Sequence, residues 1–271
     1  MTRSNLHQER LLKLDSHKVV YQFHNQISRL KGIGNNEIWM SDSKKFNDPL
    51  DFVLNIKDLT HRGSFTNMDR IKQAMDCLLS DEFLDDYWLY DNILLDDIKD
   101  WIKTDKDICH LQGIFNRKIN SCGVSCFTSS WNNQLMWSHY ANSHQGFCVE
   151  YCVRPMTLVQ KNADFLLYDV QYHSSLPELC LTELLFSPYQ ALIKVFATKR
   201  IEWAYEREWR LIHISKKAEL VCLPIGMQVS ALIVGHRTSC EERKCLKKVG
   251  EKLNIPVYEV GITSYNEYLL R

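Results

Sequence analysis

Charged side chains alternate with large aromatic ones in the stretch W-x-Y-E-R-E-W-R, which covers residues 203–210. If this stretch is an extended strand, Glu206, Glu208 and Arg210 lie on one face of it. Burying such a face without partners is costly, so we expect it to line either solvent or a polar cleft. The aromatic neighbours favour the cleft, and these three residues are therefore the catalytic candidates.

A second polar segment, F-N-D-P-L-D at residues 46–51, follows a predicted strand at residues 37–41. Asn-Asp-Pro is a typical turn sequence, because short polar side chains bond their own backbone and proline fixes φ. That turn chemistry needs no ligand. Its place after a strand nevertheless predicts that Ser41, Asn47 and Asp48 lie at the rim of a sheet, where binding sites are common.

An aromatic segment, W-N-N-Q-L-M-W-S-H-Y-A at residues 131–141, is predicted to be helical. Trp137 and Tyr140 suit stacking on the flat ring of a ligand. A histidine beside such aromatic residues is more often structural, so His139 is a binding candidate with a competing structural interpretation. We expect Gly146 to let the chain turn from this helix into the next strand, with His144 as a cap or rim residue.

The composition is that of a globular protein with a substantial core. The chain has 271 residues, 45% of them hydrophobic, and its 33 Lys and Arg residues balance 33 Asp and Glu residues. No global positive field exists, so bulk binding to nucleic acid or to an acidic membrane is disfavoured. The sequence contains no apolar run long enough to span a membrane and no apolar signal core near its start, so we expect a soluble, cytoplasmic protein.

The ten cysteines are expected to be reduced thiols. Cys122 with Cys126 and Cys148 with Cys152 are spaced Cys-x-x-x-Cys, whereas structural zinc sites usually have Cys-x-x-Cys or a histidine partner at helical spacing. Even spacing on a strand puts both thiols on one face, and cysteine is common in protein cores. We therefore expect no metal.

The order of the predicted elements indicates an α+β fold, with a mixed, twisted central sheet and flanking helices. A helical block at residues 66–120 is predicted to be an insertion within a single domain of residues 1–271. A helix over residues 176–199 is predicted to be interrupted near Pro188, because proline removes a backbone donor. Further strands are predicted at 19–24, 123–127, 146–151, 166–172, 220–223, 231–235 and 257–260, and further helices up to residue 15, at 25–33 and at 240–253.

Six separated motifs resemble, in the same order, those of a large bacterial family of unknown function. The resemblance runs over residues 19–268 without the helical block, and it implies no established activity. It adds Tyr21, from the first motif, to the binding candidates. The motifs are Y-x-F (21–23), F-N-D-P-x-D (46–51), C-F-T (126–128), M-W-S-H-Y (136–140), H-x-G-F (144–147) and W-x-Y-E-x-E-W-R (203–210).

A weaker resemblance links the chain to ADP-ribosyltransferases, particularly to their toxin-like branch. It rests on an early Tyr-His-Tyr-like strand, a following strand that ends in serine and a late strand that carries a glutamate. It implies that NAD is a substrate, that Tyr140 or Trp137 stacks on nicotinamide, and that Ser41 belongs to the site. It also implies that Glu208 bonds the ribose and stabilises an oxocarbenium-like transition state.

One position departs from the ADP-ribosyltransferase pattern, which has His or Arg on the early strand. Gln22 or His24 stands there in this chain. The resemblance further implies a small-molecule nucleotide partner, a protein or nucleic-acid acceptor, and a role as a toxin or an anti-phage defence effector in a bacterium or phage.

Two other functions remain open from the residues alone. A metal-dependent nuclease or phosphodiesterase could use Asp48, Glu206 and Glu208 as Mg²⁺ ligands and Lys199 as a charge stabiliser. A non-catalytic binding protein could instead use the same groups as a structural polar network, in which Arg210 pairs with Asp48 or Glu206.

Overall fold

The computed structural model describes two compact units of the chain. The first unit comprises Met1–Ser41, Val124–Asp169 and Ala204–Arg271, and the second comprises Asp42–Gly123 and Val170–Trp203. Within them, the described residues are 18–57, 97, 100, 108–162, 164–180, 183, 188–262 and 268–270. The predicted helix before residue 15 and most of the predicted insertion at residues 66–120 lie outside these ranges.

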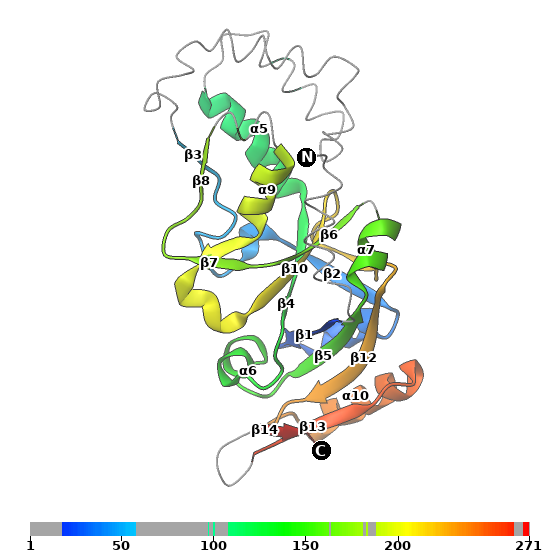
Figure 1. Cartoon of the computed structure of the whole chain (residues 1–271). Helices are drawn as coiled ribbons and strands as arrows, with labels where there is room; N and C mark the ends of the chain where they lie inside the picture. Colours follow the sequence, from blue (N-terminus) through cyan, green and yellow to red (C-terminus); the bar gives the residue numbers. More distant parts are fainter. Residues whose placement is uncertain are drawn as a thin grey trace. The chain divides into compact units, whose positions relative to one another are not determined.

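A ten-stranded sheet forms the first unit (Figure 1). Its strand order is β11-β2-β4-β1-β5-β12-β13-β14, with β10 paired to β4 and β6 paired to β10. β12 and β13 are parallel, whereas β1 with β5 and β12 with β5 are antiparallel, so the predicted α+β fold with a mixed sheet is confirmed. The strands are β1 (Lys18–His24), β2 (Glu37–Asp42), β4 (Gly123–Thr128), β5 (Phe147–Val153), β6 (Phe165–Asp169), β10 (Glu208–His213), β11 (Glu219–Cys222), β12 (Met227–Val234), β13 (Val257–Ile262) and β14 (Tyr268–Leu270).

Alternation along β1 separates two hydrophobic clusters on the two faces of this sheet. Val20 belongs to the larger cluster, whereas Tyr21 and Phe23 contact the smaller one. Helix α6 (Gln134–Tyr140) packs against β1 and contributes Trp137 to the smaller cluster. Helix α10 (Cys240–Leu253) packs against β12 and β13 and contributes Leu246 to the larger one.

Local capping explains where the two principal helices of the first unit begin. The Asn133 side chain accepts from the backbone N–H groups of Leu135 and Met136 at the start of α6. Ser239 and Glu242 form a capping box at the start of α10. The shorter helices of this unit are η1 (Ile27–Arg29), α2 (Leu30–Ile33) and α7 (Pro155–Lys161).

The second unit contains two small parallel sheets, β3 (Asn55–Lys57) with β8 (Glu178–Cys180) and β7 (Gln171–His173) with β9 (Thr198–Arg200). Its α5 (Ile108–Ser121) buries Leu111, Ile114 and Phe115, which recur at helical spacing. The short η2 (Ser43–Lys45) follows β2, and η5 (Ile201–Glu206) follows β9.

Two predicted boundaries of the second unit differ from the structure. In the predicted helix over residues 176–199, residues 178–180 instead pair with β3 as a strand, and α9 covers Pro188–Phe196. Proline at the first position of a helix is favourable, since its missing N–H has no partner there in any case. The predicted strand at residues 166–172 is divided into β6 and β7.

The described cysteines are free thiols, with Cys122 and Cys148 buried, and burial raises the pKa of the Cys148 thiol, as does the nearby Glu150 charge. In the part of the chain that the structure describes, every helix is too short or too polar to cross a membrane.

Candidate functional site

Glu208 and Arg210 form a bidentate ion pair on one face of β10. Arg210 Nε donates to Glu208 Oε1 at 2.8 Å and Nη2 donates to Oε2 at 3.0 Å. The two residues keep only 4% and 0% of their surface exposed. Their position on the same face follows from strand alternation, as predicted. The planar guanidinium therefore neutralises the Glu208 carboxylate inside the first unit.

Glu206 does not share this strand face, so the prediction of three charged residues in one row is wrong for it. The residue ends η5, and β10 begins only at Glu208. Between them, Arg207 has a φ of 45°, in the left-handed region that non-glycine residues seldom occupy. This change of backbone direction separates the two glutamates of the motif.

Glu206 instead faces Tyr140 from α6. The Tyr140 hydroxyl donates to Glu206 Oε1 at 2.5 Å, a short hydrogen bond of the kind expected between a phenol and a carboxylate. Glu206 is 3% exposed, whereas Tyr140 is half-buried. The pair therefore joins a buried carboxylate to a ring that reaches the surface of the first unit.

Two further hydrogen bonds place Glu206 opposite α6. Asn133 Nδ2 donates to the backbone oxygen of Tyr205 at 2.6 Å, so the residue that caps α6 also holds the residue before Glu206. The Ser129 N–H donates to the backbone oxygen of Arg207 at 3.2 Å. Both neighbours of Glu206 are thus tied to the segment that leads into α6.

Aromatic rings surround this tyrosine–glutamate pair. The centroid of the His139 ring lies 6.3 Å from that of Tyr140 and 6.3 Å from that of Tyr205. His139 is exposed, and Tyr205 is half-buried. The structure therefore brings together Glu206, Tyr140 and His139 of the predicted site residues.

Trp137 has a different position from the one predicted. Its ring is 0% exposed and contacts Phe23 edge to face at 4.9 Å between centroids. The indole Nε1–H donates to the backbone oxygen of Trp131 at 2.7 Å. Trp137 is thus a core residue of the smaller cluster, instead of the surface for ring stacking that the sequence predicted.

On β1, Tyr21 lies on the face that α6 covers, whereas Gln22 and His24 lie on the opposite face of the strand. Gln22 Nε2 donates to Ser125 Oγ at 2.8 Å. His24 stacks on Phe147, and its buried Nε2 has no hydrogen-bond partner among the described residues. Of Tyr21, Gln22 and His24, Tyr21 is therefore the one on the α6 face.

Tyr21 belongs to a polar group that the sequence did not indicate as such. Its hydroxyl bonds Glu150, and burial followed by the Glu150 charge raises its pKa. Ser230 Oγ donates to Glu150 Oε1 at 2.8 Å. The register between β12 and β5 shifts between Val229 and Ala231, and such a bulge re-aims a side chain. The acidic residue in the otherwise apolar strand F-C-V-E-Y-C-V was the available signal for Glu150.

The remaining candidates divide between the two units. Ser41 follows Met40 of the larger cluster on β2, so its side chain belongs to the opposite face, where it is half-buried. Asn47 and Asp48 belong to the second unit. Asp48 Oδ1 accepts from the Leu50 N–H at 2.9 Å, which is the turn chemistry predicted for this segment.

Lys199, the proposed charge stabiliser of the nuclease interpretation, lies inside the second unit. Its Nζ is 3.8 Å from Asp51 Oδ2 and 4.7 Å from the centroid of the Trp203 ring. Both charged side chains are buried. Within the described ranges, no three His, Cys, Asp or Glu side chains gather in a way that could hold a metal ion.

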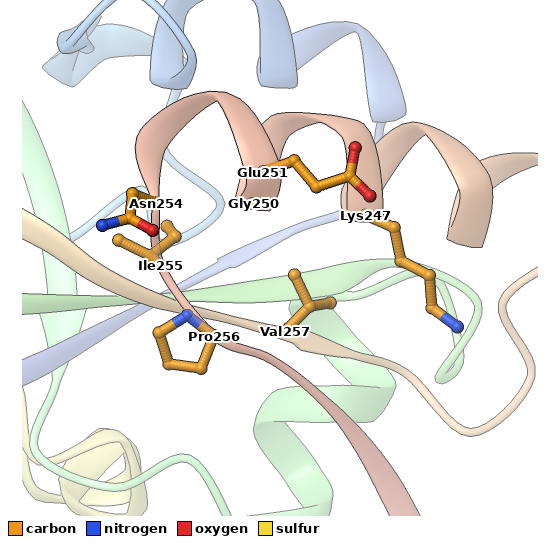
Figure 2. Close-up of a pocket in the computed structure, with 7 residues that line it drawn as sticks. All are labelled: Lys247, Gly250, Glu251, Asn254, Ile255, Pro256 and Val257. Carbon is orange, nitrogen blue, oxygen red and sulfur yellow. The ribbon is translucent and has the colours of Figure 1, made fainter.

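A surface hollow lies elsewhere in the first unit, at the end of α10 (Figure 2). It has a volume of about 440 Å³, and Lys247, Glu251, Asn254, Pro256 and Val257 line it. Figure 2 shows an open depression between the helix end and the start of β13. None of the predicted site residues lines it.

The comparisons with known proteins bear on the part of the chain that contains the tyrosine–glutamate pair. No curated protein and no solved structure was found to match the chain. A family model described as a protein of unknown function (DUF2971) matches residues 136–211. That match includes α6 from Met136 onward, Glu206, Glu208 and Arg210, and it supports the predicted resemblance to a domain family of unknown function over those residues.

Proposed function

We propose that the chain is an ADP-ribosyltransferase-like enzyme that breaks the bond between nicotinamide and ribose in NAD, with Glu206 as its catalytic carboxylate. The observation that carries this proposal is the 2.5 Å hydrogen bond from Tyr140 to Glu206. A fixed carboxylate next to aromatic rings suits a reaction whose transition state is flat and positively charged at the ribose.

The reaction needs little from the protein beyond charge and position. As the C1′–N bond breaks, its electron pair leaves with nicotinamide, and the ribose develops positive charge. The negative charge of the Glu206 carboxylate stabilises this positive charge, and Tyr140 holds one of the carboxylate oxygens in place. An oxygen or nitrogen nucleophile of an acceptor, or a water molecule, then forms the new bond to C1′ and loses its proton.

Glu208 is a poorer choice for this role, although the family resemblance pointed to it. Both of its oxygens accept from Arg210, so its charge is already compensated. Tyr140, Tyr205 and His139 supply ring surfaces beside Glu206 for nicotinamide or adenine. The acceptor would be a protein or a nucleic acid, in keeping with a toxin or an anti-phage defence effector.

The buried Glu208–Arg210 pair favours a second candidate, a non-catalytic binding protein with a structural polar network. Arg210 is 0% exposed, and a fully buried guanidinium with a bidentate partner needs no catalytic purpose. In that case, substitution of either glutamate would change neither NAD binding nor nicotinamide release. The nuclease interpretation has no comparable support from the described residues, given the lack of a ligand cluster among them.

A thermal-shift measurement with NAD tests the proposal directly, using ADP-ribose, nicotinamide and MgCl₂ as separate additions. A ligand at one hundred times its Kd stabilises the folded state by about 2.7 kcal/mol, which raises Tm by roughly 5–10 °C in a chain of this size. We expect that shift with NAD and a smaller one with ADP-ribose. Release of nicotinamide, measured by chromatography, should accompany it. A shift with Mg²⁺ alone, or none with NAD, would contradict the proposal.

Expression in a bacterial host tests the proposed effector role. We expect the wild-type chain to slow growth and Glu206→Gln to relieve that effect at equal protein level. Glu219→Gln is the matched control, because Glu219 is exposed on β11 of the same unit. Equal toxicity of all three proteins would argue against an effect that depends on Glu206.

A further inference from the structure

The first unit contains a second group of hydrogen-bonded polar side chains, of which Glu206 is not a member. Ser138 Oγ lies 3.3 Å from His144 Nε2, and Tyr268 Oη lies 3.2 Å from His144 Nδ1. Ser138 comes from α6, His144 from the turn after it, and Tyr268 from β14. Ser138 is exposed, and the other two are half-buried. A hydroxyl that reaches solvent therefore contacts an imidazole whose second nitrogen contacts another hydroxyl.

The backbone fixes the position of this imidazole at some cost. Asn142, Ser143 and His144 have φ values of 48°, 53° and 71°, three left-handed residues in succession and none of them glycine. A non-glycine residue in this region is strained and persists only where the surrounding structure holds it. The sequence instead predicted that Gly146 would supply the unusual backbone conformation.

Gly146 and Gly235 instead allow neighbouring backbone segments to approach closely. A Cβ on Gly146 would lie 2.0 Å from the backbone oxygen of His24, and one on Gly235 would lie 2.4 Å from that of His144. The Arg237 N–H donates to the same His144 oxygen at 2.9 Å. The turn that carries His144 is therefore pressed against both β1 and the end of β12.

The ring of His144 is also held in place by its neighbours. It stacks on Trp137 with an angle of 10° and 6.3 Å between centroids. Burial lowers the pKa of His144, and the nearby positive groups Arg237 and His236 lower it further. Burial raises the pKa of Tyr268, so its hydroxyl keeps its proton at neutral pH. At pH 7, the imidazole is thus neutral and able to accept a proton.

We propose that Ser138, His144 and Tyr268 form an acyl-transfer site that hydrolyses small carboxylic esters carrying a negative charge. In the required tautomer, His144 Nδ1–H donates to Tyr268 Oη, which leaves Nε2 to accept from the Ser138 hydroxyl. A serine next to a base that a third group orients is the arrangement that activates a hydroxyl nucleophile.

Besides the ester, the proposed reaction consumes only water. Ser138 Oγ forms a bond to the ester carbonyl carbon while its proton passes to His144 Nε2. The bond between that carbon and the leaving oxygen breaks, and the alcohol departs with the proton from Nε2. A water molecule then attacks the acyl-serine in the same way, releases the carboxylic acid and restores the hydroxyl.

Arg237 gives the site its preference for a negatively charged ester. Its side chain is exposed, and its charge acts on both His144 and Tyr268. No described carboxylate forms an ion pair with it. Because exposed charge pairs contribute little, the preference for a charged over a neutral ester should be modest, about threefold.

Labelling with a fluorophosphonate tests the nucleophile in the full chain. The serine oxygen forms a bond to phosphorus, and the fluoride leaves with the proton. We expect one adduct by intact mass, located on Ser138 by peptide mapping and absent in Ser138→Ala. Ser28→Ala, which removes an exposed hydroxyl on η1, should label as the wild type does. An adduct on another residue, or none, would overturn the proposal.

Substitution of His144 tests the base while preserving the turn. His144→Asn is suitable because asparagine tolerates the left-handed conformation better than other non-glycine residues. Labelling and hydrolysis of p-nitrophenyl hemisuccinate should both fall by about 100-fold, with an unchanged melting temperature. An adduct rate that survives this substitution would contradict the assigned role of His144.

The positioning and charge roles have their own readouts. Tyr268→Phe should lower the rate of hydrolysis and move the pH at which the rate rises, because the tautomer is no longer fixed. Arg237→Gln should reduce the ratio of the p-nitrophenyl hemisuccinate rate to the p-nitrophenyl acetate rate by about threefold. An unchanged ratio would contradict the assignment of Arg237 to charge selection.

Discussion

Glu206 and Glu208 stand two residues apart in one motif, yet their surroundings give them different chemistry. Both are nearly fully buried, at 3% and 4% exposed. Glu206 accepts from a neutral phenol, whereas Glu208 accepts from a guanidinium. Both oxygens of Glu208 accept from a cation, whereas one oxygen of Glu206 accepts from a phenol. This difference in partners, at similar burial, is the ground on which we propose Glu206 as the catalytic carboxylate and Glu208 as a residue that stabilises the fold.

A single backbone feature produces this difference. Arg207 adopts a left-handed conformation between the end of η5 and the start of β10. The side chain of Glu206 consequently leaves the strand pattern and meets Tyr140, while Glu208 and Arg210 keep the spacing of a strand. Alternation places side chains correctly only while the backbone stays extended, and left-handed Arg207 interrupts the extended backbone between the two glutamates.

The largest expected effect concerns the buried ion pair. Arg210→Met leaves the Glu208 carboxylate buried without its cation, which should lower the free energy of unfolding by about 3–5 kcal/mol. Denaturation in urea measures the loss. The double variant Glu208→Leu/Arg210→Met removes both charges and should recover most of that stability. A single variant as stable as the wild type would contradict the structural role of the pair.

A smaller effect is expected at Tyr140, the tyrosine of the proposed catalytic pair. Tyr140→Phe removes a hydrogen bond to a charged group, which should cost about 2 kcal/mol of stability and slow nicotinamide release more than it weakens NAD binding. Tyr258→Phe is the matched control, because Tyr258 is exposed on β13. If Tyr140→Phe leaves turnover unchanged, the short hydrogen bond does not orient a catalytic carboxylate.

The pH dependence of stability separates His24, a half-buried residue with a buried Nε2, from both glutamates. Burial, together with the Arg29 charge, lowers the pKa of His24 from 6.5 to about 3 in the folded state. Between these values the unfolded chain binds the additional proton, so stability is complete above pH 6.5 and falls with decreasing pH. The slope reaches about 1.4 kcal/mol per pH unit at most.

Thermal unfolding between pH 7 and pH 4 measures this slope, and His24→Phe should flatten it. The pKa values of His144 and His213 are also lowered in the folded state, so part of the dependence of stability on pH will remain in His24→Phe. The phenyl ring preserves the stacking on Phe147. A slope that does not change in His24→Phe would assign the acid sensitivity to other groups.

Regular elements could be predicted from the sequence, because their signals are local. Alternation identified β1, strands were also predicted where β2 and β5 lie, and the predicted last helix matched α10 at both ends. The charged face formed by Glu208 and Arg210 also followed from alternation. These predictions depend only on residues that are close together in the chain, where the period of the backbone determines the face.

The site required information that no local pattern contains. Glu206 meets Tyr140, which lies 66 positions earlier, and His144 meets Tyr268, 124 positions later. The bulge at Ser230 and the left-handed Arg207 are backbone irregularities without a glycine to mark them. Strand pairing brings these residues together, and the order of strands in a mixed sheet cannot be read from a single sequence.

Nicotinamide release by Glu206→Gln and Glu208→Gln, measured side by side, tests the central claim most directly. Both proteins are assayed with NAD below their melting transitions, and turnover is divided by the folded fraction. We predict that Glu206→Gln loses about 100-fold or more in turnover at an unchanged Tm, while Glu208→Gln lowers Tm and keeps its turnover per folded molecule. Loss of turnover in a fully stable Glu208→Gln, with Glu206→Gln still active, would contradict the account.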